Sequence, residues 1–210
     1  MIDPEAERER VWDHLPYGPF PTFDAYRDWV ADVASRDDPL FFAIRVGRTG
    51  RVEGVASLME IRPHFGVIEI GHINLSTVLQ NTIEATEGLY LLMTYAMDEL
   101  GYRRFEWKCN ALNVPSRRAA ERYGFTYEGT FRNHMVVKGR NRDTAWYAIT
   151  DDEWPAIRRG FEAWLSFTVA AGEVVVRQPF VPPPCPVGLV CARTRLAEGP
   201  ILPGRQIPRA

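Results

Sequence analysis

The sequence predicts a mixed α/β fold of the α+β class, and three features carry that prediction. Some segments place apolar residues at helical spacing, others read as strands, and clusters of turn residues separate them. The predicted order is a helix, three antiparallel strands, a long helix, a strand, a short helix, a hairpin and a last helix. Of the 210 residues, 46% are hydrophobic and 12% aromatic, which suffices for one sizeable core.

The amino-terminal elements are a helix and an antiparallel meander. Residues 22–35 carry apolar side chains at helical spacing, and Thr22 is the candidate for the N-cap. Strands are predicted at 39–46, 52–61 and 67–76, and the turn-forming segment GRTG joins the first two.

Helices and strands alternate in the second half of the body. Residues 82–100 predict a long amphipathic helix, with Asn81 and Glu84 at capping-box spacing and Gly101 as a left-handed stop. The remaining elements are a strand, a short helix, a hairpin that turns at GRNR and a last helix, within residues 103–110, 110–125, 125–150 and 151–165.

The composition changes from Thr168 onward, where eight of the 16 prolines lie. Each proline removes an N–H donor and fixes φ, so we expect an irregular tail in which only EVVVR, at 173–177, is strand-like. The sequence therefore predicts a folded body at 1–167 and a proline-rich, largely irregular tail at 168–210.

Charge and cysteine content argue against several classes of function. The net charge of −2 gives no reason to expect a nucleic-acid or membrane partner. No apolar run reaches the ~18 residues that a membrane span needs, and the amino terminus has no signal-peptide pattern. The three cysteines lack metal-ligand spacing. We expect a cytoplasmic monomer or homodimer without a bound metal.

Residues 110–125, NALNVPSRRAAERYGF, hold the most specific motif of the chain. Its spacing, N-x-x-S-x-x-x-x-E-x-x-GF, stands between a predicted strand and a predicted hairpin. Together with the preceding long helix, this segment resembles the GNAT superfamily of acyl-CoA-dependent N-acetyltransferases, and is most similar to its ribosomal-protein acetyltransferase branch. The resemblance covers roughly residues 20–165.

The resemblance implies a GNAT-like fold, in which a twisted, mostly antiparallel sheet carries helices on both faces. Its third and fourth strands would splay to form a cleft for acyl-CoA. The implied activity is direct transfer of an acetyl group, in a ternary complex, from the co-substrate acetyl-CoA to a primary amine of a protein N-terminus or a small molecule. The alternative is a degenerate member that binds acyl-CoA or a partner protein without turnover.

The resemblance assigns the pyrophosphate of CoA to the loop before the long helix. Gln80 and Ala85 match the ends of the family signature Q/R-x-x-G-x-G/A, whereas Ile83 replaces its first glycine. The implied phosphate-binding groups are the backbone N–H groups of Thr82, Ile83, Glu84 and Ala85. The alternative is an ordinary helix start that favours acidic residues.

The short helix would lie beside the pantetheine arm and the thioester. Asn113 is implied to bind pantetheine, and it is also a candidate N-cap. Many family members carry a tyrosine, as acid for the leaving thiolate, where this chain has Ala120. Ser116, one turn earlier on the same face, inherits that role or is a plain first-turn serine. Arg118 is a candidate for CoA phosphates or is simply solvated.

Three residues are candidates for the catalytic base. Glu69, in the apolar strand segment VIEIG, matches a position where the family often has a catalytic Glu, or it is a salt-bridged strand residue. His72 is the second candidate and is expected on the opposite face by strand alternation. His134 in the hairpin is the third. Backbone N–H groups near Gly71 and His72 would polarise the thioester carbonyl.

Overall fold

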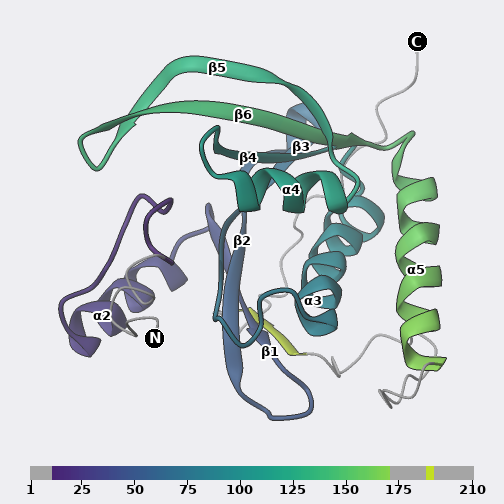
Figure 1. Cartoon of the computed structure of the whole chain (residues 1–210), viewed down its shortest axis with the longest axis horizontal. Helices are drawn as coiled ribbons and strands as arrows, with labels where there is room; N and C mark the ends of the chain where they lie inside the picture. The colour runs from purple at the N-terminus through teal and green to yellow at the C-terminus, as the bar shows by residue number, and fades with distance from the viewer. Residues whose placement is uncertain (1–10, 171–187, 192–210) are drawn as a thin grey trace.

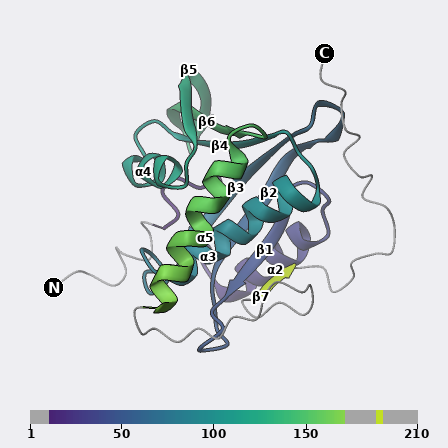
Figure 2. The ribbon, with the colours of Figure 1, turned by 90° about the vertical axis from the view of Figure 1, so that its right-hand side faces the viewer.

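A seven-stranded sheet forms the centre of the structure, a computed structural model that describes residues 11–170 and 188–191. The strand order is β5-β6-β4-β3-β2-β1-β7, and every neighbouring pair is antiparallel except β3 and β4, which are parallel. Helix α2 covers one face, and α3 and α5 lie on the other (Figures 1 and 2). The predicted α+β class, with helices on both faces of a mostly antiparallel sheet, is confirmed.

The elements follow the predicted order along the chain. Their bounds are α2 Phe23–Ala34, β1 Leu40–Arg45, β2 Val52–Arg62, the 3-10 turn η1 Pro63–Phe65, β3 Val67–Leu75, α3 Ile83–Thr94, the π turn η2 Tyr95–Glu99, β4 Arg104–Asn110, α4 Val114–Arg122, β5 Thr126–Val137, β6 Arg140–Thr150, α5 Trp154–Ala170 and β7 Gly188–Cys191. No helix within residues 11–170 is both long and apolar enough to cross a membrane.

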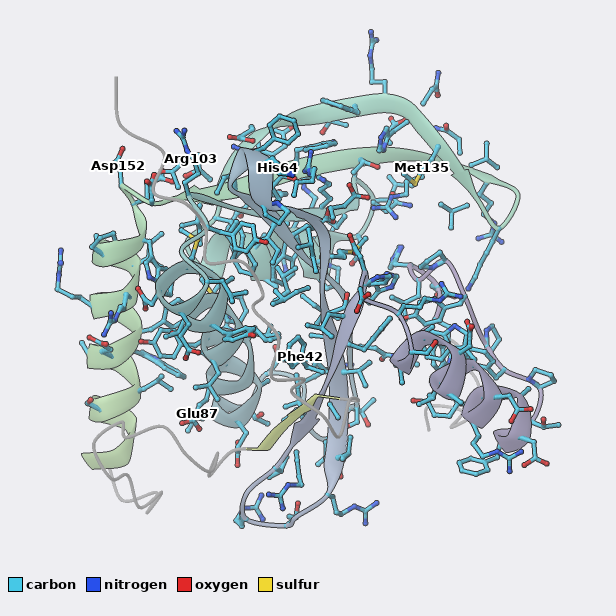
Figure 3. The ribbon with its side chains drawn as sticks, turned by 180° about the vertical axis from the view of Figure 1, so that it is seen from behind. Phe42, His64, Glu87, Arg103, Met135 and Asp152 are labelled. Carbon is cyan, nitrogen blue, oxygen red and sulfur yellow. The ribbon has the colours of Figure 1, made fainter. Side chains whose placement is uncertain are left out.

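The main core lies between the sheet and the layer of α3 and α5. Phe42 of β1 points into it in Figure 3. Leu58, Ile70, Leu92 and Phe105 are at most 1% exposed, so the apolar faces of β2, β3, α3 and β4 close on one another. The other face of the sheet holds the polar and aromatic groups described below.

The start of α3 differs from the prediction. The side chain of Thr82 accepts the N–H of Ala85 at 3.1 Å, and Thr82 has the extended backbone of an N-cap. Asn81 instead has a left-handed backbone, with φ of 60°, which an asparagine adopts more readily than most residues. The predicted cap at Asn81 is therefore wrong, whereas those at Thr22 and Asn113 are confirmed.

The turn of the β5–β6 hairpin begins one residue before the predicted turn segment GRNR. Its two turn residues are Lys138 and Gly139, both left-handed with φ of 50° and 72°, as a two-residue hairpin turn requires. Strand β6 then begins at Arg140. The hairpin reaches past the rest of the sheet on the side of α2, and Met135 lies near its far end in Figure 3.

The tail contributes a strand that the sequence did not predict. Gly188–Cys191 pairs antiparallel with β1, in a proline-free stretch between Pro186 and Pro200. The strand predicted at 173–177 lies outside the described residues. Helix α5 runs to Ala170, three residues beyond the predicted end of the body at 167. The division into a body and a tail remains a prediction.

The identity of the α3 cap can be tested with two substitutions. Thr82→Ala should lower the free energy of unfolding by about 1 kcal/mol, because the N–H of Ala85 loses its acceptor. Asn81→Gly should change it by less than about 0.5 kcal/mol, because glycine adopts the same left-handed backbone. Urea unfolding measures both. An equal loss in the two variants would return the cap to Asn81.

Candidate functional site

Strands β3 and β4 stay together for only part of their length. Their parallel ladder joins Val67–Ile70 with Arg104–Trp107. Strand β3 continues to Leu75 and β4 to Asn110, and the described residues show no ladder between these ends. The predicted splay between the third and fourth strands is therefore present.

A bulge in β3 begins where the two strands part. Ser57 of β2 pairs with Gly71 and Val55 pairs with Asn74, so β3 contains one extra residue. His72 lies in this bulge with a left-handed φ of 51°, and its ring centroid is 5.1 Å from that of Phe41.

The bulge decides which face His72 occupies. Phe41 and Gly71 both pair with Ser57, so they share one face of the sheet. Glu69 is two residues before Gly71 and lies on the same face. The bulge brings His72 there as well, and the prediction that His72 and Glu69 lie on opposite faces is wrong.

Glu69 is a buried member of an ion pair. It is 5% exposed, and its Oε2 accepts a hydrogen bond from Nζ of Lys108 at 2.8 Å. The same ammonium lies 2.9 Å from Oε2 of Glu106 and 4.1 Å from the ring centroid of Trp146. Burial raises the pKa of Glu69, and the charge of Lys108 only partly opposes that rise.

Glu106 has more cationic partners than Glu69. Arg104 donates to it at 2.7 Å and Arg62 at 2.9 Å, in addition to Lys108. Burial would raise the pKa of Glu106, but the hydrogen bonds from Arg104 and Lys108 lower it. The two carboxylates beside Lys108 thus have pKa values shifted in opposite directions. In such a pair, the residue with the lowered pKa, Glu106, stays anionic, whereas the residue with the raised pKa, Glu69, is able to exchange a proton.

A cavity of about 440 Å³ opens on the same face of the sheet. It is lined by Pro16, Tyr17, Trp29, Val33, Arg36, Asp38, Pro39, Phe41, Met59, Glu60 and His72. Met59 pairs with Glu69 across β2 and β3, which places the cavity next to the ion pair. The rings of Tyr17 and His72 stack with centroids 5.4 Å apart. Burial lowers the pKa of His72 to about 4, so its ring is neutral at pH 7.

His134 faces this region from the hairpin. Its Nδ1 lies 2.9 Å from the hydroxyl of Thr144, and its ring centroid is 6.1 Å from that of Trp146, which packs under Lys108. Lys138 at the hairpin turn donates to the carbonyl oxygen of Trp12 at 2.9 Å, which ties the hairpin to the segment that carries Tyr17. All three base candidates therefore face one side of the sheet.

The loop before α3 retains two N–H groups without an acceptor in the described part of the chain. The N–H of Thr82 donates to the carbonyl of Leu79, and that of Ala85 to Thr82, which leaves the groups of Ile83 and Glu84. The carboxylate of Glu84 lies 4.0 Å from Arg48. The side chain of Gln80, a further predicted cofactor residue, donates to the carbonyl of Leu75 at 2.9 Å.

The start of α4 holds the motif residues Asn113 and Ser116. The side chain of Asn113 accepts the N–H of Ser116 at 3.2 Å, and the Ser116 hydroxyl accepts Nε1–H of Trp107 at 3.0 Å. Trp107 ends the β3–β4 ladder, so Ser116 lies where the two strands part. Arg118, the predicted phosphate ligand, is exposed.

Sequence reasoning missed two cations at this site. Arg122 donates to the Thr86 hydroxyl of α3 at 3.2 Å and lies 4.6 Å over the ring of Tyr123. It is four residues after Arg118, and that helical spacing could have identified it. Lys108 was missed as the partner of Glu69, although strand alternation places it on the same face as Glu106.

Comparison with known proteins assigns a family to this arrangement. The Acetyltransferase (GNAT) domain family matches residues 3–126. The chain is 47% identical to a GCN5-related N-acetyltransferase from Brucella melitensis, over 76% of this chain and 75% of that one, with a TM-score of 0.73. It is 41% identical to an acetyltransferase, provisionally assigned to the GNAT family, from Chromobacterium violaceum, over 70% of this chain and 78% of that one, with a TM-score of 0.64.

A shorter match links the chain to a curated relative. YdaF of Bacillus subtilis (strain 168), named provisionally as a ribosomal N-acetyltransferase, is 36% identical over 63 residues. The match covers 30% of this chain and 34% of that protein, so the chain spans about a third of this relative's length.

The burial of His72 makes stability depend on pH. Between pH 6.5 and 4 the His72 ring is protonated in the unfolded chain but stays neutral in the folded one. As the pH falls through this range, the free energy of unfolding should therefore decrease by roughly 3 kcal/mol because of this group. His72→Asn accepts the left-handed backbone and cannot titrate, so its stability should fall less steeply over that range. Urea unfolding at several pH values compares the slopes. Parallel curves for the two proteins would contradict the lowered pKa.

Proposed function

Because the chain belongs to the GNAT acetyltransferase family, we propose that it transfers an acetyl group from acetyl-CoA to a primary amine. The observation that carries this proposal is the buried carboxylate of Glu69, which has a raised pKa and lies beside the opening between β3 and β4. The names of the relatives as N-acetyltransferases support the amine as acceptor.

The residues at the start of α3 fit the phosphates of CoA. The free N–H groups of Ile83 and Glu84 offer the donors that an anion needs at a helix N-terminus. Arg122 adds a cation one turn into the helix, and Arg48 offsets the charge of Glu84. The side chain of Ile83, where the family signature has glycine, does not remove its N–H. Gln80 helps to shape the loop through its bond to Leu75.

The start of α4 fits the pantetheine arm and the sulfur. Asn113 keeps its helix cap and retains its amide N–H groups as donors for pantetheine. The Ser116 hydroxyl accepts from Trp107, and its own O–H, which lies beside the Cys109 thiol, could donate a hydrogen bond to the leaving thiolate. A thiol pKa of ~8.5 makes that thiolate only about 2 kcal/mol uphill at pH 7, so the proposed acid is a modest aid.

The acceptor amine makes the heavier demand. Deprotonation at pH 7 costs roughly 4.6 kcal/mol for a lysine amine of pKa ~10.4, and roughly 1 kcal/mol for an α-amine of pKa ~7.8. In the proposed step the amine nitrogen forms a bond to the acetyl carbon, the carbon–sulfur bond breaks, and the amine proton passes to Glu69. His72 and His134 remain the other candidates for the base.

Acetyl-CoA should stabilise the fold by mass action. At a hundredfold excess over its Kd we expect a gain of roughly 2.7 kcal/mol, measured by thermal unfolding. Arg122→Gln should weaken binding more than the matched variant Arg118→Gln, because the guanidinium of Arg122 is already held at Thr86. The absence of any thermal shift at millimolar acetyl-CoA would remove the enzyme proposal.

The base can be identified from the pH dependence of thiol release. With Glu69 as base, the rate should rise above the ordinary carboxyl pKa and level off near the pKa of the acceptor amine. Glu69→Gln should lower kcat about 100-fold or more, with the largest loss at low pH. Glu128→Gln, at an exposed ion pair with Arg104, is the control. Wild-type kinetics in Glu69→Gln would transfer the role to His72 or His134.

A further inference from the structure

The cavity beside His72 has the size and lining of a small-molecule site. Its volume of about 440 Å³ falls in the range of ligand pockets. Four of its lining side chains are aromatic, from Tyr17, Trp29, Phe41 and His72. Tyr17 and Trp29 have ring centroids 4.3 Å apart, and Trp29 meets Phe41 edge-on at 5.7 Å. These rings form a wall suited to an apolar or aromatic body.

Two polar atoms in this wall have no hydrogen-bond partner among the described residues. They are the hydroxyl oxygen of Tyr17 and Nδ1 of His72, and both are buried. A buried polar group without a partner costs free energy, so its presence calls for an explanation. A bound polar group that reaches either atom would remove that cost.

The two carboxylates that line the cavity, those of Asp38 and Glu60, differ in their hydrogen bonds. Both oxygens of Asp38 accept backbone N–H groups, from Glu60 at 3.1 Å and from Ile61 at 3.0 Å. Arg36 is paired with Asp32. The carboxylate of Glu60 is exposed and has no ion pair or hydrogen bond in residues 11–170.

Glu60 lines the cavity, and Glu69 lies next to that end of it. Met59, which lines the cavity, pairs with Glu69 and directly precedes Glu60. The charge of Glu60 contributes to the raised pKa of Glu69. An amine nitrogen at this end would meet a carboxylate that attracts its ammonium form and a second one able to take its proton.

We propose that the acceptor is a small monoamine with an aromatic or branched apolar body, which packs on Tyr17, Trp29 and Phe41 with its nitrogen toward Glu60 and Glu69. This inference rests on the proposed function and names the substrate class of that same site. A single ammonium matches Glu60, whereas each oxygen of Asp38 already accepts a backbone N–H.

An acceptor panel tests the class directly. Purified full-length protein is assayed for thiol release from acetyl-CoA with phenethylamine, isoamylamine, spermidine and a short peptide with a free α-amine. We expect kcat/KM for phenethylamine or isoamylamine to exceed the values for spermidine and the peptide at least tenfold. A preference for spermidine or for the peptide would overturn the proposal.

Variants of the wall separate this site from the acetyl-CoA site. Trp29→Ala should raise KM for phenethylamine about tenfold with little change in kcat, and Trp29→Phe should restore most of the loss. Phe23→Ala, at a 75% exposed position on the same helix, is the matched control and should behave as wild type. An unchanged KM in Trp29→Ala, or a Trp29→Phe protein that folds but gains nothing over Trp29→Ala, would contradict the proposal.

Direct binding distinguishes failure of this inference from failure of the proposed function. Calorimetry with phenethylamine alone should show binding to the wild-type protein that Glu60→Gln weakens several-fold. A thermal shift with acetyl-CoA but no preference for apolar monoamines would overturn only the substrate class. Amine binding without any acetyl-CoA shift would instead overturn the proposed transfer.

Discussion

The ion pair between Glu69 and Lys108 crosses the sheet where its two halves part. One half contains β7, β1, β2 and β3, and the other contains β4, β6 and β5. Among the described residues, the one ladder between the halves is the short one that ends at Ile70 and Trp107. Lys108 is the next residue of β4, and it joins Glu69 on one side to Glu106 on the other. Lys108 is the only salt-bridge partner of Glu69 among the described residues, so removal of Lys108 would leave that buried carboxylate uncompensated.

The same constraint separates two carboxylates that look alike in sequence. Glu106 is neutralised by Arg62 and Arg104 as well as by Lys108, whereas Glu69 shares that one ammonium and is buried beside the cavity. Burial raises the pKa of Glu69 against the opposing charge of Lys108, and that raised pKa suits Glu69 to its proposed role as base. The sequence had presented a salt-bridged residue and a catalytic base as alternatives for Glu69, and the proposed function assigns the base role to a residue that is also ion-paired.

Local sequence patterns correctly predicted the structural features that depend on residues close in the chain, such as the cap of α2 by Thr22 and the short helix after Asn113. What they missed depends on distant partners. The face of His72 follows from a mismatch of one residue between β2 and β3. The partner of Glu69 lies 39 positions away across a parallel pair. Strand β7 needs the free edge of β1, which no property of its own four residues reveals.

The residues proposed for the donor and for the acceptor come from different stretches of the chain. The cavity is lined by residues 16–72, whereas the proposed contacts to CoA begin at Gln80 and end at Arg122. The first stretch supplies α2 and the rings around it, and the second supplies two helix starts. With the sites as proposed, substitutions in the amino-terminal third alone would change acceptor preference and leave the proposed acyl-donor contacts intact, a modular route to new substrates.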